Sequence, residues 1–345
     1  LLGPLSDRFG RRPVLLGGLA TFALAGIACA LSTNMTMLLV FRLIQGIGAG
    51  AGGTLPFAII RDLFDGMKAK TRMSAVTVVL GAGPIIAPLL GAALLQIGDW
   101  RLIFGALGIA GFVLLAIVML GFEETFRDGK HHALSARGML ASYHGVLTNR
   151  RFLGNAMVNA AAFSCMFAYI SGSPAVLMGN MGASSGTFSL LFACAAAAFM
   201  LGSALNGTLA TKLVSSRALV LTGTLCLVIG SVAILVLTFA GALRQATFTA
   251  LSALSIFGCG FLSPTVAHDA LQPMGRQAGV ASAALRCMQM LLAAGASALV
   301  GFFYDGQTAL ATASVMTGFA LIALLAQQIF LFNLGPRVDL LVSEK

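Results

Sequence analysis

Between Phe152 and Thr211 the chain reads FLGNAMVNAAAFSCMFAYISGSPAVLMGNMGASSGTFSLLFACAAAAFMLGSALNGTLAT, sixty consecutive residues without Asp, Glu, Lys or Arg. A transmembrane helix needs about 20 mostly apolar residues, because the hydrocarbon core of a bilayer is about 30 Å thick. This stretch is therefore long enough for two crossings. Its apolar residues do not alternate with polar ones, so helices are predicted rather than transmembrane strands.

The composition of the whole chain agrees with this interpretation. Of its 345 residues, 58% are hydrophobic and only 9% are charged. A soluble globular domain averages about 45–50% apolar and about 25% charged residues. The formal net charge of +10 has a better explanation in membrane topology than in nucleic-acid binding, because basic residues collect in cytoplasmic loops. The sequence predicts an all-α integral membrane protein.

Ten transmembrane helices are predicted from the apolar runs. They cover residues 14–32, 36–60, 74–97, 102–122, 152–177, 186–208, 218–241, 245–268, 279–302 and 308–332. Seventeen of the 21 Lys and Arg residues fall in loops on the side of the first residue, against two, Arg101 and Arg244, on the opposite side. The positive-inside rule therefore predicts that both ends of the printed chain lie in the cytoplasm.

An internal repeat organises these helices into two halves. Residues Gly3–Phe9 match Gly207–Leu213 at an offset of 204, and both segments join two predicted spans. Parallel repeats of this kind are common in transporters. We expect residues 1–122 to form an N-terminal bundle, 123–151 a cytoplasmic central loop, and 152–345 a six-helix bundle. Four spans before the loop and six after it predict two further spans upstream, so that ten of an expected twelve are visible.

Three ordered motifs carry a family resemblance. The loop Gly3-Pro4-Leu5-Ser6-Asp7-Arg8-Phe9-Gly10-Arg11-Arg12 resembles the signature between the second and third helices of the major facilitator superfamily. The run Arg42-Leu43-Ile44-Gln45-Gly46 resembles the Arg-x-x-Gln-Gly pattern of its fourth helix, and Gly83-Pro84-Ile85-Ile86-Ala87-Pro88 resembles a fifth-helix pattern of drug:proton antiporters. Gly98–Phe104 and Glu123-Glu124-Thr125 look like the bicyclomycin-resistance (Bcr/CflA) branch. The resemblance implies a major facilitator fold with two pseudo-repeated six-helix halves.

The first motif implies a conformational latch. By resemblance, Asp7 faces a helix of the second half, and Arg8, Arg11 or Arg12 pairs with Asp62 at the end of the fourth helix. Gly3 and Gly10 permit the tight turn that the loop requires. The latch would stabilise the outward-open state by closing the cytoplasmic side. The alternative is that these charges only set the topology.

The second motif implies proton coupling through Arg42, Gln45 and Gly46. Arg42 lies about six residues inside its predicted span, and a charge at the middle of a membrane costs about 2.5–3.5 kcal/mol on insertion scales. None of the 11 acids lies at a comparable depth in the visible spans. Related drug antiporters keep an acid on their first helix, so we expect the partner of Arg42 and the proton carrier upstream. Snorkelling of Arg42 to the interface is the alternative.

The third motif, with Gly83, Pro84, Pro88 and Gly91, implies a kinked helix, because proline removes backbone hydrogen bonds. In the antiporter family this kink seals the interface between the halves, whereas ordinary packing is the alternative. Asp269 and Arg286 form a possible ion pair between neighbouring spans, although Arg286 could also snorkel. No metal site is predicted, because His131-His132 have few acids nearby and the six cysteines are widely spaced.

The resemblance implies an exporter that exchanges hydrophobic or cationic drugs for protons by alternating access. We expect a monomer in the bacterial inner membrane, with drugs, protons and the lipid bilayer as its partners and with no cofactor. No nucleotide-binding motif is present, and no nucleophile–base pair indicates an enzyme. A proton-coupled metabolite or sugar symporter of the same superfamily is the nearest alternative. A membrane-embedded enzyme is the alternative from another class.

Overall fold

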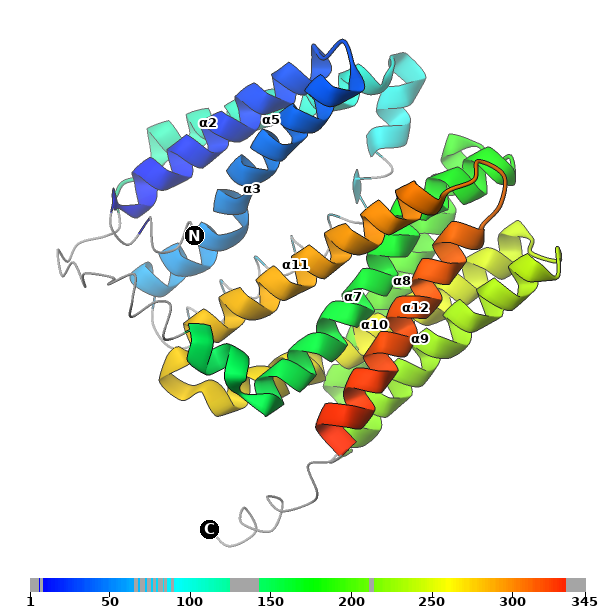
Figure 1. The fold of residues 1–345 in the computed structure, drawn as a ribbon. Helices are drawn as coiled ribbons and strands as arrows, with labels where there is room; N and C mark the ends of the chain where they lie inside the picture. Colours follow the sequence, from blue (N-terminus) through cyan, green and yellow to red (C-terminus); the bar gives the residue numbers. More distant parts are fainter. Residues whose placement is uncertain are drawn as a thin grey trace, which may run out of the picture. The chain divides into compact units, whose positions relative to one another are not determined.

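The structure is a computed structural model that describes Ser6, residues 9–64, 90–124, 143–210 and 214–332, and isolated positions between 68 and 87. The chain divides into two compact units, Leu1–Ser135 and Ala136–Lys345. Their boundary falls within 123–151, the segment expected to link the two halves. Figure 1 shows the helices of each unit, and the two units are described separately.

The N-terminal unit contains α2 (Arg11–Ala30), α3 (Met35–Leu63) and α5 (Trp100–Gly121). Helix α2 packs along both α3 and α5 (Figure 1). Polar side chains define where two of these helices begin. Asn34 Oδ1 accepts a hydrogen bond of 2.8 Å from the N–H of Met37 at the start of α3, and Asp99 Oδ1 accepts one of 3.0 Å from the N–H of Arg101 at the start of α5. Each bond satisfies a helix donor that has no intrahelical partner.

Glycine allows the helices of this unit to approach closely. A Cβ atom on Gly48 of α3 would lie 2.5 Å from the backbone nitrogen of Phe22, and one on Gly108 of α5 would lie 2.9 Å from that of Ile27. Both neighbours belong to α2, so any larger side chain at either glycine would push two backbones apart. Close approach of this kind is typical of transmembrane helix pairs.

The C-terminal unit contains a complete set of six long helices within its described residues. Its elements are α7 (Arg150–Pro174), η1 (Ala175–Asn180), α8 (Ser185–Ala210), α9 (Ser216–Phe239), α10 (Gln245–Leu271), η2 (Gln272–Gln277), α11 (Ala278–Phe303), α12 (Leu310–Ala326) and η3 (Gln327–Phe332). Helix α7 contacts α10, α11 and α12, and α10 contacts α8 and α9. The core between them is apolar and includes Tyr169, which stacks on Phe192 of α8 and Phe248 of α10.

Nine helices in the described part of the chain are long and apolar enough to cross a membrane. They correspond one to one with nine of the ten predicted spans, and no strand occurs among the described residues. The predicted all-α, multi-pass architecture is therefore confirmed. The tenth predicted span, 74–97, lies partly outside the described residues, and its described positions are helical.

Candidate functional site

The turn that precedes α2 depends on Gly10. Gly10 has φ 96° and ψ 155°, a backbone conformation that is open to glycine and strained for other residues. Its N–H donates a hydrogen bond of 3.1 Å to the carbonyl oxygen of Ser6. A Cβ atom on Gly10 would lie 2.5 Å from Glu124 Oε2. The dihedral angle therefore requires glycine where α2 begins, and a larger residue there would also displace the carboxylate of Glu124.

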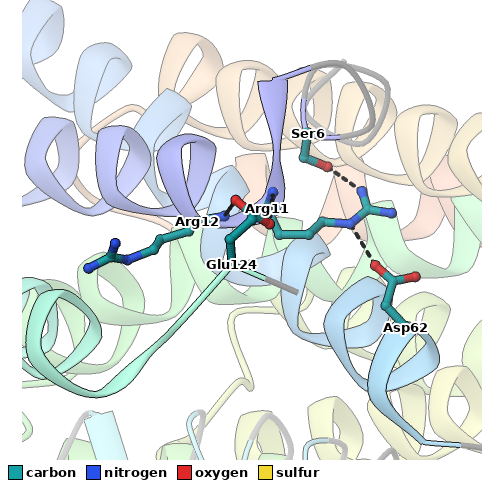
Figure 2. A network of polar contacts seen from close by, with 5 residues as sticks. All are labelled: Ser6, Arg11, Arg12, Asp62 and Glu124. Atoms are coloured by element: carbon teal, nitrogen blue, oxygen red, sulfur yellow. Dashed lines mark hydrogen bonds and ion pairs between the residues drawn. The ribbon is translucent and has the colours of Figure 1, made fainter. Parts of the chain in front are cut away.

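The side chain of Arg11 is buried and forms an ion pair with a partly buried carboxylate at the end of α3. Its Nε donates to Asp62 Oδ2 at 2.8 Å, and its Nη1 donates to Ser6 Oγ (Figure 2). The Arg11 side chain is 3% exposed and that of Asp62 is 22% exposed. A buried guanidinium is costly unless a counter-charge and hydrogen bonds satisfy it. Asp62 supplies that charge, so the pair connects α2 to α3.

Glu124, just beyond α5, binds the first turn of α2. Its Oε1 accepts a hydrogen bond of 3.0 Å from the N–H of Arg11, and its Oε2 accepts one of 3.1 Å from the N–H of Arg12 (Figure 2). A carboxylate at this position satisfies free N–H groups and interacts favourably with the helix dipole. In the opposite direction, Arg12 Nη2 donates 2.8 Å to the carbonyl oxygen of Met119 near the end of α5.

Together these contacts join the ends of α2, α3 and α5 in one network, called here the α2 network: Ser6, Gly10, Arg11, Arg12, Asp62 and Glu124. The sequence had singled out Gly10, Arg11, Arg12 and Asp62, and the structure brings all four together. The other residues of the predicted latch, Gly3, Asp7 and Arg8, lie outside the described residues. Glu124 was missed as a site residue. Glu124 had entered the sequence analysis only as part of Glu123-Glu124-Thr125, a segment that resembles the Bcr/CflA branch, and no contact with α2 was predicted for it.

Arg42 lies on α3 beside an aromatic ring. Its Nη1 donates 2.8 Å to Gln45 Oε1, and its Cζ lies 5.3 Å from the centroid of the Phe104 ring. Gln45 is 1% exposed, and its Nε2 is buried without a hydrogen-bond partner in the described part of the chain. Among the described residues no carboxylate is ion-paired with Arg42. A Cβ atom on Gly46 would have no described atom within 4 Å.

The third motif is only partly described. Gly83 and Gly91 are helical, and a Cβ atom on either would meet no described atom within 4 Å. Pro84 and Pro88 lie outside the described residues, so the kink stays a prediction.

Asp269 and Arg286 do not form an ion pair in the described part of the chain. Asp269 lies beside the hydroxyl group of Ser216 at the first residue of α9 and interacts electrostatically with Arg151 and His268. Arg286 lies on an exposed face of α11. The structure therefore does not bring together the two residues that the sequence offered as a possible pair, because other helix ends surround Asp269.

The described residues also contain no group of three His, Cys, Asp or Glu side chains that could hold a metal ion. The adjacent residues His131 and His132 are not among the described residues.

The nine apolar helices of the described part of the chain define a multi-pass helical membrane protein. The model of the Major Facilitator Superfamily matches residues 1–298, and the chain belongs to this family. Its members are transporters and not enzymes, so the predicted class of protein and the predicted fold are confirmed.

Two relatives and one solved structure illustrate the similarity. The chain is 32% identical over 328 residues to the uncharacterized MFS-type transporter YdgK of Bacillus subtilis, covering 94% of this chain and 81% of the relative. It is 35% identical over 188 residues to the multidrug resistance protein MdtM of Salmonella typhimurium, covering 54% of this chain and 45% of that relative. The chain thus spans about half the length of this multidrug relative. A partially occluded, inward-open xylose transporter XylE from Escherichia coli matches with a TM-score of 0.66 at 16% identity, covering 97% of this chain and 83% of that chain.

We expect Glu124→Gln to lower the free energy of unfolding by about 1 kcal/mol, the usual effect of losing a charged cap at a helix N-terminus. Glutamine keeps one oxygen that can accept from the N–H group of Arg11 or of Arg12. Its NH₂ group then faces the remaining N–H group, which loses its acceptor. Unfolding in mixed detergent micelles measures the difference. Glu123→Gln is the matched control, since no contact to α2 is found for its side chain in the described part of the chain. Equal losses from the two variants would contradict the assigned capping role.

Proposed function

We propose that the protein exports hydrophobic drugs across the bacterial inner membrane in exchange for protons, by alternating access. The observation that carries the proposal is the 35% identity with a protein called multidrug resistance protein MdtM. Membership of a transporter family supports movement of a small molecule across the bilayer. The positive-inside distribution of Lys and Arg supports the placement of both printed ends in the cytoplasm. The exported compounds are expected to be hydrophobic or cationic drugs.

In this proposal the α2 network acts as the conformational latch. The ion pair between Arg11 and Asp62 connects the start of α2 to the end of α3. The cap by Glu124 connects the start of α2 to the segment just after α5. These bonds favour the state in which the protein is closed on the side of these helix ends. Asp7, Gly3 and Arg8 complete the latch by family resemblance. Since an equilibrium shifts tenfold for each 1.4 kcal/mol, loss of one such contact is enough to change the population of the two states.

Proton coupling is assigned to Arg42 together with Gln45 and Gly46. An arginine inside a membrane span has to interact with a polar or anionic group, and in the described structure it donates to Gln45. Protonation of an acid that faces Arg42 would weaken that interaction and link a proton to the conformational change. The kink at Gly83, Pro84, Pro88 and Gly91 would limit proton leak between the halves.

Purified protein in proteoliposomes tests this function. A fluorescent hydrophobic drug reports drug movement, and a pH-sensitive dye inside the vesicles reports proton movement. We expect an imposed pH gradient to drive drug transport, and addition of the drug to release protons. Arg42→Gln should abolish the coupled proton flux, whereas Arg101→Gln, which removes an exposed cation at the start of α5, should not. The proposal would be contradicted if the rate of drug movement did not depend on the pH gradient. It would also be contradicted by proton-coupled uptake of a sugar in place of drug export.

A further inference from the structure

Arg42 of α3 contacts an aromatic ring and an amide, both within the N-terminal unit. Its Cζ lies 5.3 Å from the centroid of the Phe104 ring of α5, and its Nη1 donates 2.8 Å to Gln45 Oε1. Arg42 comes seven residues after Met35, the first residue of α3, which corresponds to a depth of about 10 Å at 1.5 Å per residue. Gln45 lies nearly one turn deeper. A side chain that snorkelled to the interface would extend in the opposite direction, so the bond to Gln45 directs the guanidinium group into the span.

Carboxylates do not explain the position of Arg42 in the described helices of this unit. Helices α2 and α5 contain no Asp or Glu, and the one acid of α3, Asp62, is paired with Arg11. Cys29 of α2, a buried thiol, interacts electrostatically with Arg42. Apart from the amide named above, the electron-rich group in contact with Arg42 is therefore the ring of Phe104.

Phe104 is half-buried, and its ring is held in place from its own helix. Trp100, one turn earlier on α5, packs against it with the ring centroids 5.9 Å apart and the ring planes at 81°, an edge-to-face arrangement that aromatic pairs favour. The one charged residue of α5, Arg101, lies over the ring of Trp100, 4.4 Å from its centroid, and is ion-paired with Asp99. Arg101 therefore does not compete with Arg42 for the ring of Phe104.

We propose that Phe104 is a positioning residue for Arg42, an inference that rests on the proposed proton coupling. The face of an aromatic ring carries partial negative charge and attracts a guanidinium group. A phenyl ring does not titrate, so this attraction is the same whether or not the coupling acid carries a proton. Phe104 therefore keeps Arg42 inside its span at the stage when that acid is neutral and no longer attracts the cation.

Movement of drug and protons by the whole chain in proteoliposomes tests this role. The variants are Phe104→Leu, which removes the ring, Phe104→Tyr, which retains it, and Phe112→Leu. Phe112 is the matched control, because it lies about two turns further along α5 and no arginine is found over its ring in the described part of the chain.

At equal amounts of folded protein, we expect Phe104→Leu to lower the drug-induced release of protons about tenfold, because a partly desolvated cation–π contact is lost. The Kd of the drug should change less than about twofold. Phe104→Tyr should keep most of the proton release, since a tyrosine ring also attracts a cation, and Phe112→Leu should match the wild type within about twofold.

A double-mutant cycle separates this inference from the proposed function. Unfolding in mixed micelles is measured for Phe104→Leu, for Arg42→Met and for both together, and the equilibrium constants should depart from independent effects by about threefold. If the wild type releases no protons with the drug, the proposed coupling is wrong. The positioning of Arg42 by Phe104 then stands if the cycle shows this dependence and is overturned if it shows none.

If the wild type does release protons, the variants decide the inference. It is overturned if Phe104→Leu releases as many protons as Phe112→Leu. It is also overturned if Phe104→Tyr loses as much proton release as Phe104→Leu, because the ring itself would then not be the group that holds Arg42.

Discussion

Asp62→Asn is expected to lower the free energy of unfolding by about 2 kcal/mol, because it removes the carboxylate that pairs with the Arg11 guanidinium. Removing one partner of a fully buried pair costs about 3–5 kcal/mol. The value expected here is smaller because Asp62 is 22% exposed, although Arg11 is only 3% exposed. Ser6 Oγ still accepts one hydrogen bond from Arg11, but a neutral oxygen does not balance the charge.

A double-mutant cycle isolates the contribution of this pair. Unfolding in mixed micelles is measured for Arg11→Met, for Asp62→Asn and for both together. We expect a coupling energy of about 1–2 kcal/mol, since contacting residues in one network are not additive. The matched control is the exposed pair of Arg101 and Asp99, whose side chains are 45% and 58% exposed. Its coupling should stay below about 1 kcal/mol. Equal coupling in the two cycles would show that burial gives the Arg11–Asp62 pair no special strength.

The same variant tests the role of the pair in transport. If the α2 network stabilises the closed side, Asp62→Asn shifts the protein toward the state that is open on that side, by about tenfold for each 1.4 kcal/mol lost. Accessibility of single cysteines to a membrane-impermeant reagent measures the shift. If Asp62→Asn lowers stability but does not change the labelling pattern, the pair is a structural contact only. That result would contradict its role in the latch.

The transmembrane helices could be predicted from the sequence because each is encoded by a continuous apolar run. Their ends were predicted less well, for reasons that the contacts make clear. Helix α2 begins at Arg11 and not at residue 14, since Glu124 accepts from the N–H groups of Arg11 and Arg12. Helix α3 continues to Leu63 and not only to residue 60, which includes Asp62 in the helix that faces Arg11. Each of these shifts depends on a partner that is distant in the sequence.

The same reasoning explains what was found and missed in the candidate site. Arg11 and Asp62 could be proposed together because charges are scarce in this chain and a motif pointed to both. Glu124 is 113 residues from Arg11, and no periodic pattern links a helix end to the start of another helix. The pairing of Asp269 with Arg286 was suggested by neighbouring spans alone. Proximity in sequence does not specify which way two side chains point around their helices, and Asp269 lies instead beside Ser216.

Gly10→Ala is expected to lower the free energy of unfolding by about 2–3 kcal/mol. Gly10 has φ 96° and ψ 155°, and holding a residue with a side chain in a conformation of this kind costs about 1–3 kcal/mol. The new Cβ atom would also lie 2.5 Å from Glu124 Oε2, so the carboxylate would have to leave the first turn of α2. Loss of a helix cap adds about 1 kcal/mol.

Three variants separate these two contributions. Gly17→Ala is the matched control, because Gly17 is inside α2 and a Cβ atom there would meet no described atom within 4 Å. Alanine should be neutral or stabilising at that position, by up to about 1 kcal/mol. When Gly10→Ala is introduced into a Glu124→Ala background, its cost should fall by about 1 kcal/mol, since the cap is already absent, while the dihedral strain remains. If Gly10→Ala and Gly17→Ala have the same effect on unfolding in mixed micelles, the turn before α2 does not need glycine, and the cap by Glu124 does not depend on the space that Gly10 leaves.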